Sequence, residues 1–239
     1  MYQKKGLYRP FAELMKKTVD APVICAGRMD DPDMALEALE NGETDMISLG
    51  RPLLADPDYV NKLRSGRVSE IRPCISCHEG CMGRIQEYSM LNCAVNPQAC
   101  RERANALNPV RIPKKVMIIG GGVAGCEAAR VLALRGHMPS LYEKGSRLGG
   151  NLLPGGAPDF KEDDIALADW FTTMLEKLRV PVYLNTEASA DDIRKSGADA
   201  VILATGSVPK VFSLGADEHV YTAAQVLMKE KDAGDTAVV

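Results

Sequence analysis

The 239-residue sequence lacks a long apolar segment, an excess of charge of either sign and a signal peptide. No apolar run approaches the roughly 20 residues that a membrane helix needs, and the opening MYQKKGLYRPF has no apolar stretch of the kind that directs secretion. The 29 basic and 32 acidic residues are mixed along the chain, so no basic face for nucleic acid is expected. These absences predict a cytoplasmic protein that binds neither membrane nor nucleic acid.

An even set of cysteines, which a framework of disulfides needs, is also missing. Seven cysteines are present, and four of them crowd between positions 74 and 93, which favours a metal site in a reducing compartment. Cys25 and Cys126 lie in apolar surroundings and are interpreted as small core residues, and Cys100 has no predicted role. His78 lies among the four clustered cysteines and is interpreted as a solvated neighbour rather than a ligand.

The first part of the chain contains two consecutive α/β units. The predicted elements are a helix over 11–19, a strand over 23–26, a helix from 32 to 41, a strand over 46–49 and a helix over 58–64. Each strand is followed by a glycine and an arginine, Gly27-Arg28 and Gly50-Arg51. Backbone donors and guanidinium groups in this arrangement suit a phosphate.

Composition divides the chain into three segments. Residues 1–72 hold the two α/β units, and residues 73–112 are rich in cysteine, proline and asparagine with little periodicity. Residues 113–239 open with VMIIGGGVAG, a strand, a glycine turn and the start of a helix. The expected class is therefore α/β, with an irregular segment between two parts.

The clustered cysteines have the spacing C-x2-C-x3-C-x11-C. The four are Cys74, Cys77, Cys81 and Cys93. Four thiolates suit either a 4Fe–4S cluster or tetrahedral zinc. Zinc sites usually pair two C-x2-C knuckles, and this segment has one, so the spacing favours iron–sulfur.

A nucleotide-binding pattern begins at Gly120, which with Gly122 and Gly125 forms G-x-G-x-x-G. A predicted strand over 116–119 precedes these glycines, a helix over 126–135 follows them, and a further strand covers 140–142. Glu143 ends that last strand, where a carboxylate accepts hydrogen bonds from ribose hydroxyls. NAD and FAD share this pattern, so the glycines alone leave the choice of dinucleotide open.

From end to end, the chain resembles the 2,4-dienoyl-CoA reductase and trimethylamine dehydrogenase group, the larger relatives of old yellow enzyme. The matching stretches are SLGRPLLADPDYVNKLRSG, the four-cysteine spacing, RLGGN and ATGSVP. The resemblance implies the C-terminal end of an FMN-binding TIM barrel, then a 4Fe–4S segment, then a Rossmann-like domain that binds FAD. It also favours FAD over NAD at the glycine turn.

Site residues follow from the resemblance, position by position. For the FMN phosphate they are Arg28, Gly50 and Arg51. For FAD they are Gly120, Gly122, Ala124, Gly125, Glu143, Asn151, Lys161 and the backbone of Ala188. The cluster ligands are the four cysteines, and no catalytic residue can be named.

Both ends of the chain depart from the family pattern. A barrel of this type needs roughly 250 residues, whereas residues 1–72 alone precede the cysteines. Thr236–Val239 resembles the first strand of an NAD(P)H-binding domain. The resemblance therefore predicts an internal or truncated piece, inactive towards alkenes by itself, whose exposed barrel strands favour self-association into a homo-oligomer.

The expected parent activity is reduction of an activated alkene, an enoyl thioester, enoate or enone, by NAD(P)H through FAD, the cluster and FMN. Three alternatives stay open at this point. The parent could be an amine dehydrogenase of the trimethylamine dehydrogenase type. The chain could instead be a non-catalytic electron-transfer or FAD-binding fragment, or a structural module that zinc stabilises.

Overall fold

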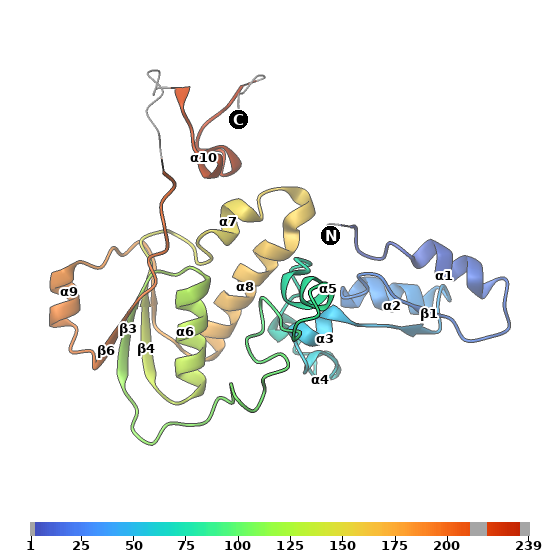
Figure 1. Cartoon of the computed structure of the whole chain (residues 1–239), viewed down its shortest axis with the longest axis horizontal. Coiled ribbons are helices and arrows are strands. Elements are labelled where there is room, and N and C mark those ends of the chain that lie inside the picture. Colours follow the sequence, from blue (N-terminus) through green and yellow to red (C-terminus); the bar gives the residue numbers. More distant parts are fainter. Residues whose placement is uncertain (1–2, 211–218, 235–239) are drawn as a thin grey trace. The chain divides into compact units, whose positions relative to one another are not determined.

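The computed structural model describes residues 3–210 and 219–234 (Figure 1). Its contacts divide the chain into two compact units, Met1–Ala106 and Leu107–Val239. Within the two described ranges, no helix is both long enough and apolar enough to cross a membrane. The strand expected at Thr236–Val239 lies outside the described residues.

The first unit contains two short strands and several short helices. Its elements are α1 (Arg9–Lys16), β1 (Ile24–Cys25), α2 (Pro32–Glu40), β2 (Met46–Ile47), α3 (Arg51–Ala55), α4 (Tyr59–Arg64), the 3-10 helix η1 (Val68–Glu70), the π-helical turn η2 (Glu79–Gly83) and α5 (Arg84–Gln86). The strands pair in parallel, with Ile24 opposite Met46. Because parallel strands end at the same edge, both Gly-Arg pairs follow their strands at one edge.

Local sequence explains why α2 forms. Asp31 caps it by accepting hydrogen bonds from the backbone N–H groups of Asp33 and Met34, and Pro32 occupies the first turn, where no N–H partner is needed. The apolar face of α2 buries Ala38 in a small core. This core is made of Ala12, Cys25, Met29 and Ala38, with Val23, Met34, Ala35 and Ile47 packed against it.

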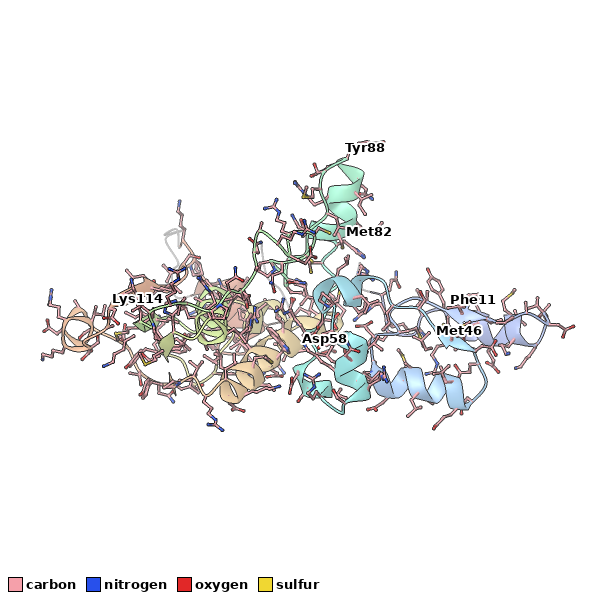
Figure 2. All side chains as sticks on the ribbon, turned by 90° about the horizontal axis from the view of Figure 1, so that it is seen from below. Phe11, Met46, Asp58, Met82, Tyr88 and Lys114 are labelled. Carbon is pink, nitrogen blue, oxygen red and sulfur yellow. The ribbon has the colours of Figure 1, made fainter. Side chains whose placement is uncertain are left out.

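Several large apolar side chains of this unit face solvent. Phe11 is 63% exposed, Leu14 61%, Ile24 57% and Met46 47%. Figure 2 labels two of them, Phe11 and Met46. An apolar surface of this kind on α1 and the two strands is typical of a face that another surface covers.

The second unit is built on one parallel sheet. Its elements are β3 (Lys115–Ile119), α6 (Val123–Leu134), β4 (Met138–Tyr142), α7 (Leu152–Gly155), the 3-10 helix η3 (Asp159–Lys161), α8 (Glu162–Lys177), β5 (Val182–Tyr183), α9 (Ala190–Lys195), β6 (Ala200–Leu203) and α10 (Ala223–Leu227). The strand order is β5-β4-β3-β6, with all neighbours parallel. The expected α/β class with a parallel sheet is confirmed.

Helices α6 and α8 pack together beside the sheet (Figure 1). The central strand β3 is apolar from Val116 to Ile119, as a strand buried on both faces requires. Leu141 on β4 and Leu175 on α8 are fully buried. The rings of Trp170 and Phe171 meet edge to face at 5.1 Å.

Most predicted elements form with bounds that differ by a few residues, as α6 and β4 show. Helix α6 begins at Val123 rather than at 126, because Gly122 is the last extended residue before the helix. Strand β4 begins at Met138 rather than at 140, since its ladder with β3 already pairs Met138 with Lys115. Helix α8 was not predicted at all.

Candidate functional site

The glycine turn after β3 is built of close backbone contacts. Gly120 has a φ of 107°, and a Cβ there would lie 2.3 Å from the carbonyl oxygen of Ala204, at the end of β6. A Cβ on Gly125 would lie 1.9 Å from the carbonyl oxygen of Gly120. Neither position admits a side chain, so these two glycines of the pattern are required by packing alone.

The first turn of α6 is open to an anion. Gly122 is its N-cap and supplies no side-chain cap, and Val123 and Ala124 in the first turn are exposed. The first N–H groups of a helix have no partner within the helix, and the helix dipole is positive at that end. The predicted residues Gly122 and Ala124 are therefore arranged as a pyrophosphate site requires.

Glu143 lies beside this turn and is held by backbone donors. One carboxylate oxygen accepts from the N–H of Gly121 and the other from the N–H of Gly145, each at 2.6 Å. An ionised carboxylate has about four acceptor positions, so about two remain for ribose hydroxyls. The structure thus brings together the glycine turn and the predicted ribose acid.

A second glycine pair, Gly149-Gly150, packs against the glycine turn that follows β3. The N–H of Gly149 donates to the carbonyl oxygen of Gly121 at 2.9 Å, and Gly122 and Gly149 form an isolated parallel bridge. A Cβ on Gly150 would lie 2.9 Å from the Cα of Gly122. Sequence analysis did not assign Gly121, Gly149 or Gly150 to the site, although the RLGGN stretch was a signal.

The remaining predicted FAD residues, Asn151, Lys161 and Ala188, follow later in the chain. Asn151 follows the second glycine pair as the exposed N-cap of α7. Ala188 lies two residues after Thr186, whose N–H donates to the carbonyl oxygen of Glu143 at 2.9 Å. Lys161 ends η3. Contacts of all three with FAD stay predictions.

In the first unit, the four clustered cysteines line one cavity. Cys74, Cys77, Cys81 and Cys93 share it with Arg51, among other residues. All four are free thiols and half-buried. The loop that carries them is bent by Ser76 and His78, which both have positive φ.

A close backbone contact brings the two ends of the loop together. The N–H of Asn92 donates to the carbonyl oxygen of Gly80 at 2.7 Å. A Cβ on Gly80 would lie 2.2 Å from Asn92 Oδ1. Glycine at position 80 therefore lets the chain before Cys93 approach the loop that holds Cys77 and Cys81.

Burial raises the pKa of two of the thiols in this cavity. Burial raises the pKa of Cys74 to about 11, against which the positive charge of Arg51 acts, and burial also raises the pKa of Cys77. These thiols are therefore protonated at neutral pH until a metal displaces the protons. Burial, followed by the charge of Arg51, lowers the pKa of His78, which favours the neutral form of this imidazole.

The cysteines line a cavity without converging on one point. In the part of the chain that the structure describes, no three His, Cys, Asp or Glu side chains form a group that could hold a metal ion. Zinc needs all four sulfurs at about 2.3 Å from a single ion. A 4Fe–4S cluster binds each thiolate through a different iron, so four thiols around a cavity fit it better, although the cluster itself stays a prediction.

The two Gly-Arg pairs have different surroundings. The Arg28 guanidinium donates to the backbone carbonyl of Gln3. Gly50 is exposed, and a Cβ there would meet no atom within 4 Å. Arg51 lines the cysteine cavity, and its buried Nη1 has no hydrogen-bond partner among the described residues. A buried unsatisfied guanidinium nitrogen is what an anion site would present.

Two family models match separate parts of the chain. The NADH:flavin oxidoreductase / NADH oxidase family matches residues 2–70, and the pyridine nucleotide-disulphide oxidoreductase family matches residues 114–239. The first match assigns the N-terminal part to the flavin oxidoreductase barrel. The second assigns the parallel sheet to the dinucleotide-binding fold.

Individual relatives cover almost the whole chain. A cinnamate reductase from Clostridium sporogenes is 51% identical over all of it. A solved 2-naphthoyl-CoA reductase complex superimposes with a TM-score of 0.91 at 32% identity, over 98% of this chain and 36% of that one. A dimethylamine dehydrogenase from a Hyphomicrobium species is 32% identical over 94% of this chain and 34% of its own length. The chain spans 36% of the cinnamate reductase.

Proposed function

Because the chain belongs to the NADH:flavin oxidoreductase family of the trimethylamine dehydrogenase type, we propose that it is the electron-transfer part of an NAD(P)H-dependent ene-reductase. Membership implies flavin and nicotinamide cofactors. When bound, FAD, FMN and a 4Fe–4S cluster would supply the redox chemistry, with the cluster carrying single electrons between two flavins.

At the glycine turn after β3, each group that is assigned to FAD binds a different part of it. The first N–H groups of α6, with Gly122 and Ala124, hold the pyrophosphate. Glu143 holds the ribose, because its carboxylate is already fixed by two backbone donors and keeps free acceptor positions. Asn151 and Lys161 are assigned to FAD on family resemblance alone.

In the first unit, the four cysteines bind the cluster as thiolates. Burial raises the pKa of Cys74 to about 11, so binding of the cluster displaces a proton from this thiol. Arg28, Gly50 and Arg51 hold the FMN phosphate. The buried, unsatisfied Nη1 of Arg51 is the observation that supports this role.

The substrate class follows from the most similar relative described above. Identity of 51% with a cinnamate reductase supports an enoate or a related activated alkene. The second candidate is amine oxidation, which the 32% identity with a dimethylamine dehydrogenase favours less strongly. Because the relatives are longer, we propose that the 239-residue chain alone does not reduce alkenes.

The first experiment is metal, sulfide and flavin analysis of anaerobically purified protein, with an absorbance spectrum. About four irons and four sulfides per chain, together with bound FAD, are expected. Cys81→Ser should lose the iron, whereas the control Cys100→Ser, at an exposed thiol outside the cavity, should keep it. Stoichiometric zinc without iron would refute the cluster, and alkene-dependent oxidation of NAD(P)H by this chain would refute its inactivity.

A further inference from the structure

Two buried polar residues flank the cysteine segment and have no role so far. Arg72 lies two residues before Cys74 and is 8% exposed. Asn96 lies three residues after Cys93 and is 4% exposed. Buried polar side chains are costly unless their hydrogen bonds hold something in place, so both positions call for an explanation.

Arg72 bridges the two ends of the segment. Its backbone N–H donates to Asp56 Oδ2 at 2.7 Å. Its guanidinium Nη1 donates to the carbonyl oxygen of Val95 at 2.9 Å, across 23 positions of sequence. One residue therefore fixes the chain that leads into Cys74 against the chain that leaves Cys93.

Both ends are also tied to α3. Asn96 Nδ2 donates to the carbonyl oxygen of Leu54 at 2.8 Å. Asp56, the C-cap of α3, accepts from Lys62 Nζ at 2.6 Å as well as from Arg72. The salt bridge with Lys62 balances the buried charge of Asp56, so the carboxylate can serve as a fixed anchor.

We propose that Arg72 is a positioning residue for the cluster, whose bond to Val95 holds Cys93 close enough to the Cys74 loop for four thiols to share one cavity. This inference rests on the proposed cluster function. The guanidinium suits the task because its planar fork holds a fixed direction, whereas a lysine ammonium on a flexible stem does not.

Side-chain substitution removes the bond to Val95. The backbone N–H of Arg72 remains in every variant, so the anchor at Asp56 is kept. We would compare wild type, Arg72→Met and Arg72→Lys in the full 239-residue chain. The matched control is Arg67→Met, which removes an exposed arginine from the same stretch of chain, where its guanidinium contacts Ser65, Asp58 and Glu70.

The readouts are iron and sulfide per chain, the electron paramagnetic resonance spectrum of the dithionite-reduced protein, and the rate of iron loss to a chelator. FAD content and the thermal midpoint report the fold. Arg72→Met should lose iron at least about tenfold faster than wild type and give an altered spectrum, with unchanged FAD content. Arg72→Lys should be intermediate, and Arg67→Met should match wild type.

Wild type without iron would refute the proposed function. Wild type with iron, and Arg72→Met with the same spectrum and rate of iron loss, would overturn only this inference. Should Arg72→Met fail to fold, Arg72→Lys decides alone. Iron loss from Arg72→Lys at the wild-type rate overturns the proposal, because lysine keeps the charge without the fork.

Discussion

Replacing Glu143 with glutamine tests whether one carboxylate both shapes the glycine turn and binds FAD. Its two oxygens accept from Gly121 and Gly145 at 2.6 Å each. Glutamine keeps one carbonyl oxygen and places an amide NH2 where the second acceptor stood. One backbone N–H then faces another donor and loses its partner.

The expected cost follows from the strength of the lost bond. A hydrogen bond to a charged group contributes about 1.5–3 kcal/mol. For a unit of this size, each kcal/mol lowers the melting temperature by about 3 °C, so apo Glu143→Gln should melt about 5–10 °C lower. Loss of a ribose acceptor of similar strength should weaken FAD binding by about 10- to 100-fold.

Calorimetry of the apo protein and titration with FAD measure the two effects separately. The control is Glu176→Gln, the same chemical change at an exposed carboxylate on α8. An apo melting temperature within about 1 °C of wild type would show that the carboxylate does not hold the turn. Unchanged FAD affinity would remove Glu143 from the binding site.

Three further predictions use single residues. Gly125→Ala should destabilise the second unit by about 3 kcal/mol or more and abolish FAD binding, because the new methyl group meets the Gly120 carbonyl oxygen. Thermal unfolding followed by circular dichroism measures the loss of stability. Burial raises the pKa of Tyr59 to about 12 against about 10 when unfolded, so its contribution to stability is complete below about pH 10 and is lost as pH rises towards 12. Urea midpoints at pH 9 and 11 should therefore differ in wild type more than in Tyr59→Phe, and an equal drop would contradict the assignment. Iodoacetamide at pH 8 should label the exposed Cys100 and leave Cys126 unlabelled until denaturant is added, because burial raises the pKa of Cys126 to about 12. Mass spectrometry of the peptides measures the labelling, and equal labelling of the two cysteines would contradict this prediction.

The parts of the fold that could be predicted are those with a local physical cause. The strand, glycine turn and helix from β3 to α6 have close contacts that only glycine allows, and those contacts leave a pattern in the sequence. In the sequence, the capping residue Asp31 stands directly before Pro32, the first residue of α2. Both regions form as expected, with bounds that differ by a few residues.

Helix α8 was missed although its sequence contains a signal. Its first turn is acidic, and Leu167, Trp170, Phe171 and Leu175 recur at helical spacing on the buried side. Periodicity alone would have found this helix.

Long-range contacts of irregular chain could not be predicted. Nothing in the sequence says that Gly149 donates to Gly121, or that the guanidinium of Arg72 reaches the carbonyl of Val95. Any residue can supply a backbone carbonyl as a hydrogen-bond acceptor, so the acceptor of such a bond is not marked in the sequence. Such contacts can be identified only when the conformation of the loops is known.

Arg51 connects the predicted phosphate site and the predicted cluster site of the first unit. The sequence presents Gly50-Arg51 as a phosphate site and the cysteines as a separate segment, yet Arg51 lines the cysteine cavity. Helix α3 begins with Arg51 and, through Leu54 and Asp56, also anchors both ends of the cysteine segment. Because α3 has five residues, its length is only about 7.5 Å at 1.5 Å per residue. Arg51 and the two anchors of the cysteine segment therefore lie within the length of one short helix, so we expect a change that tilts α3 to disturb both predicted sites together.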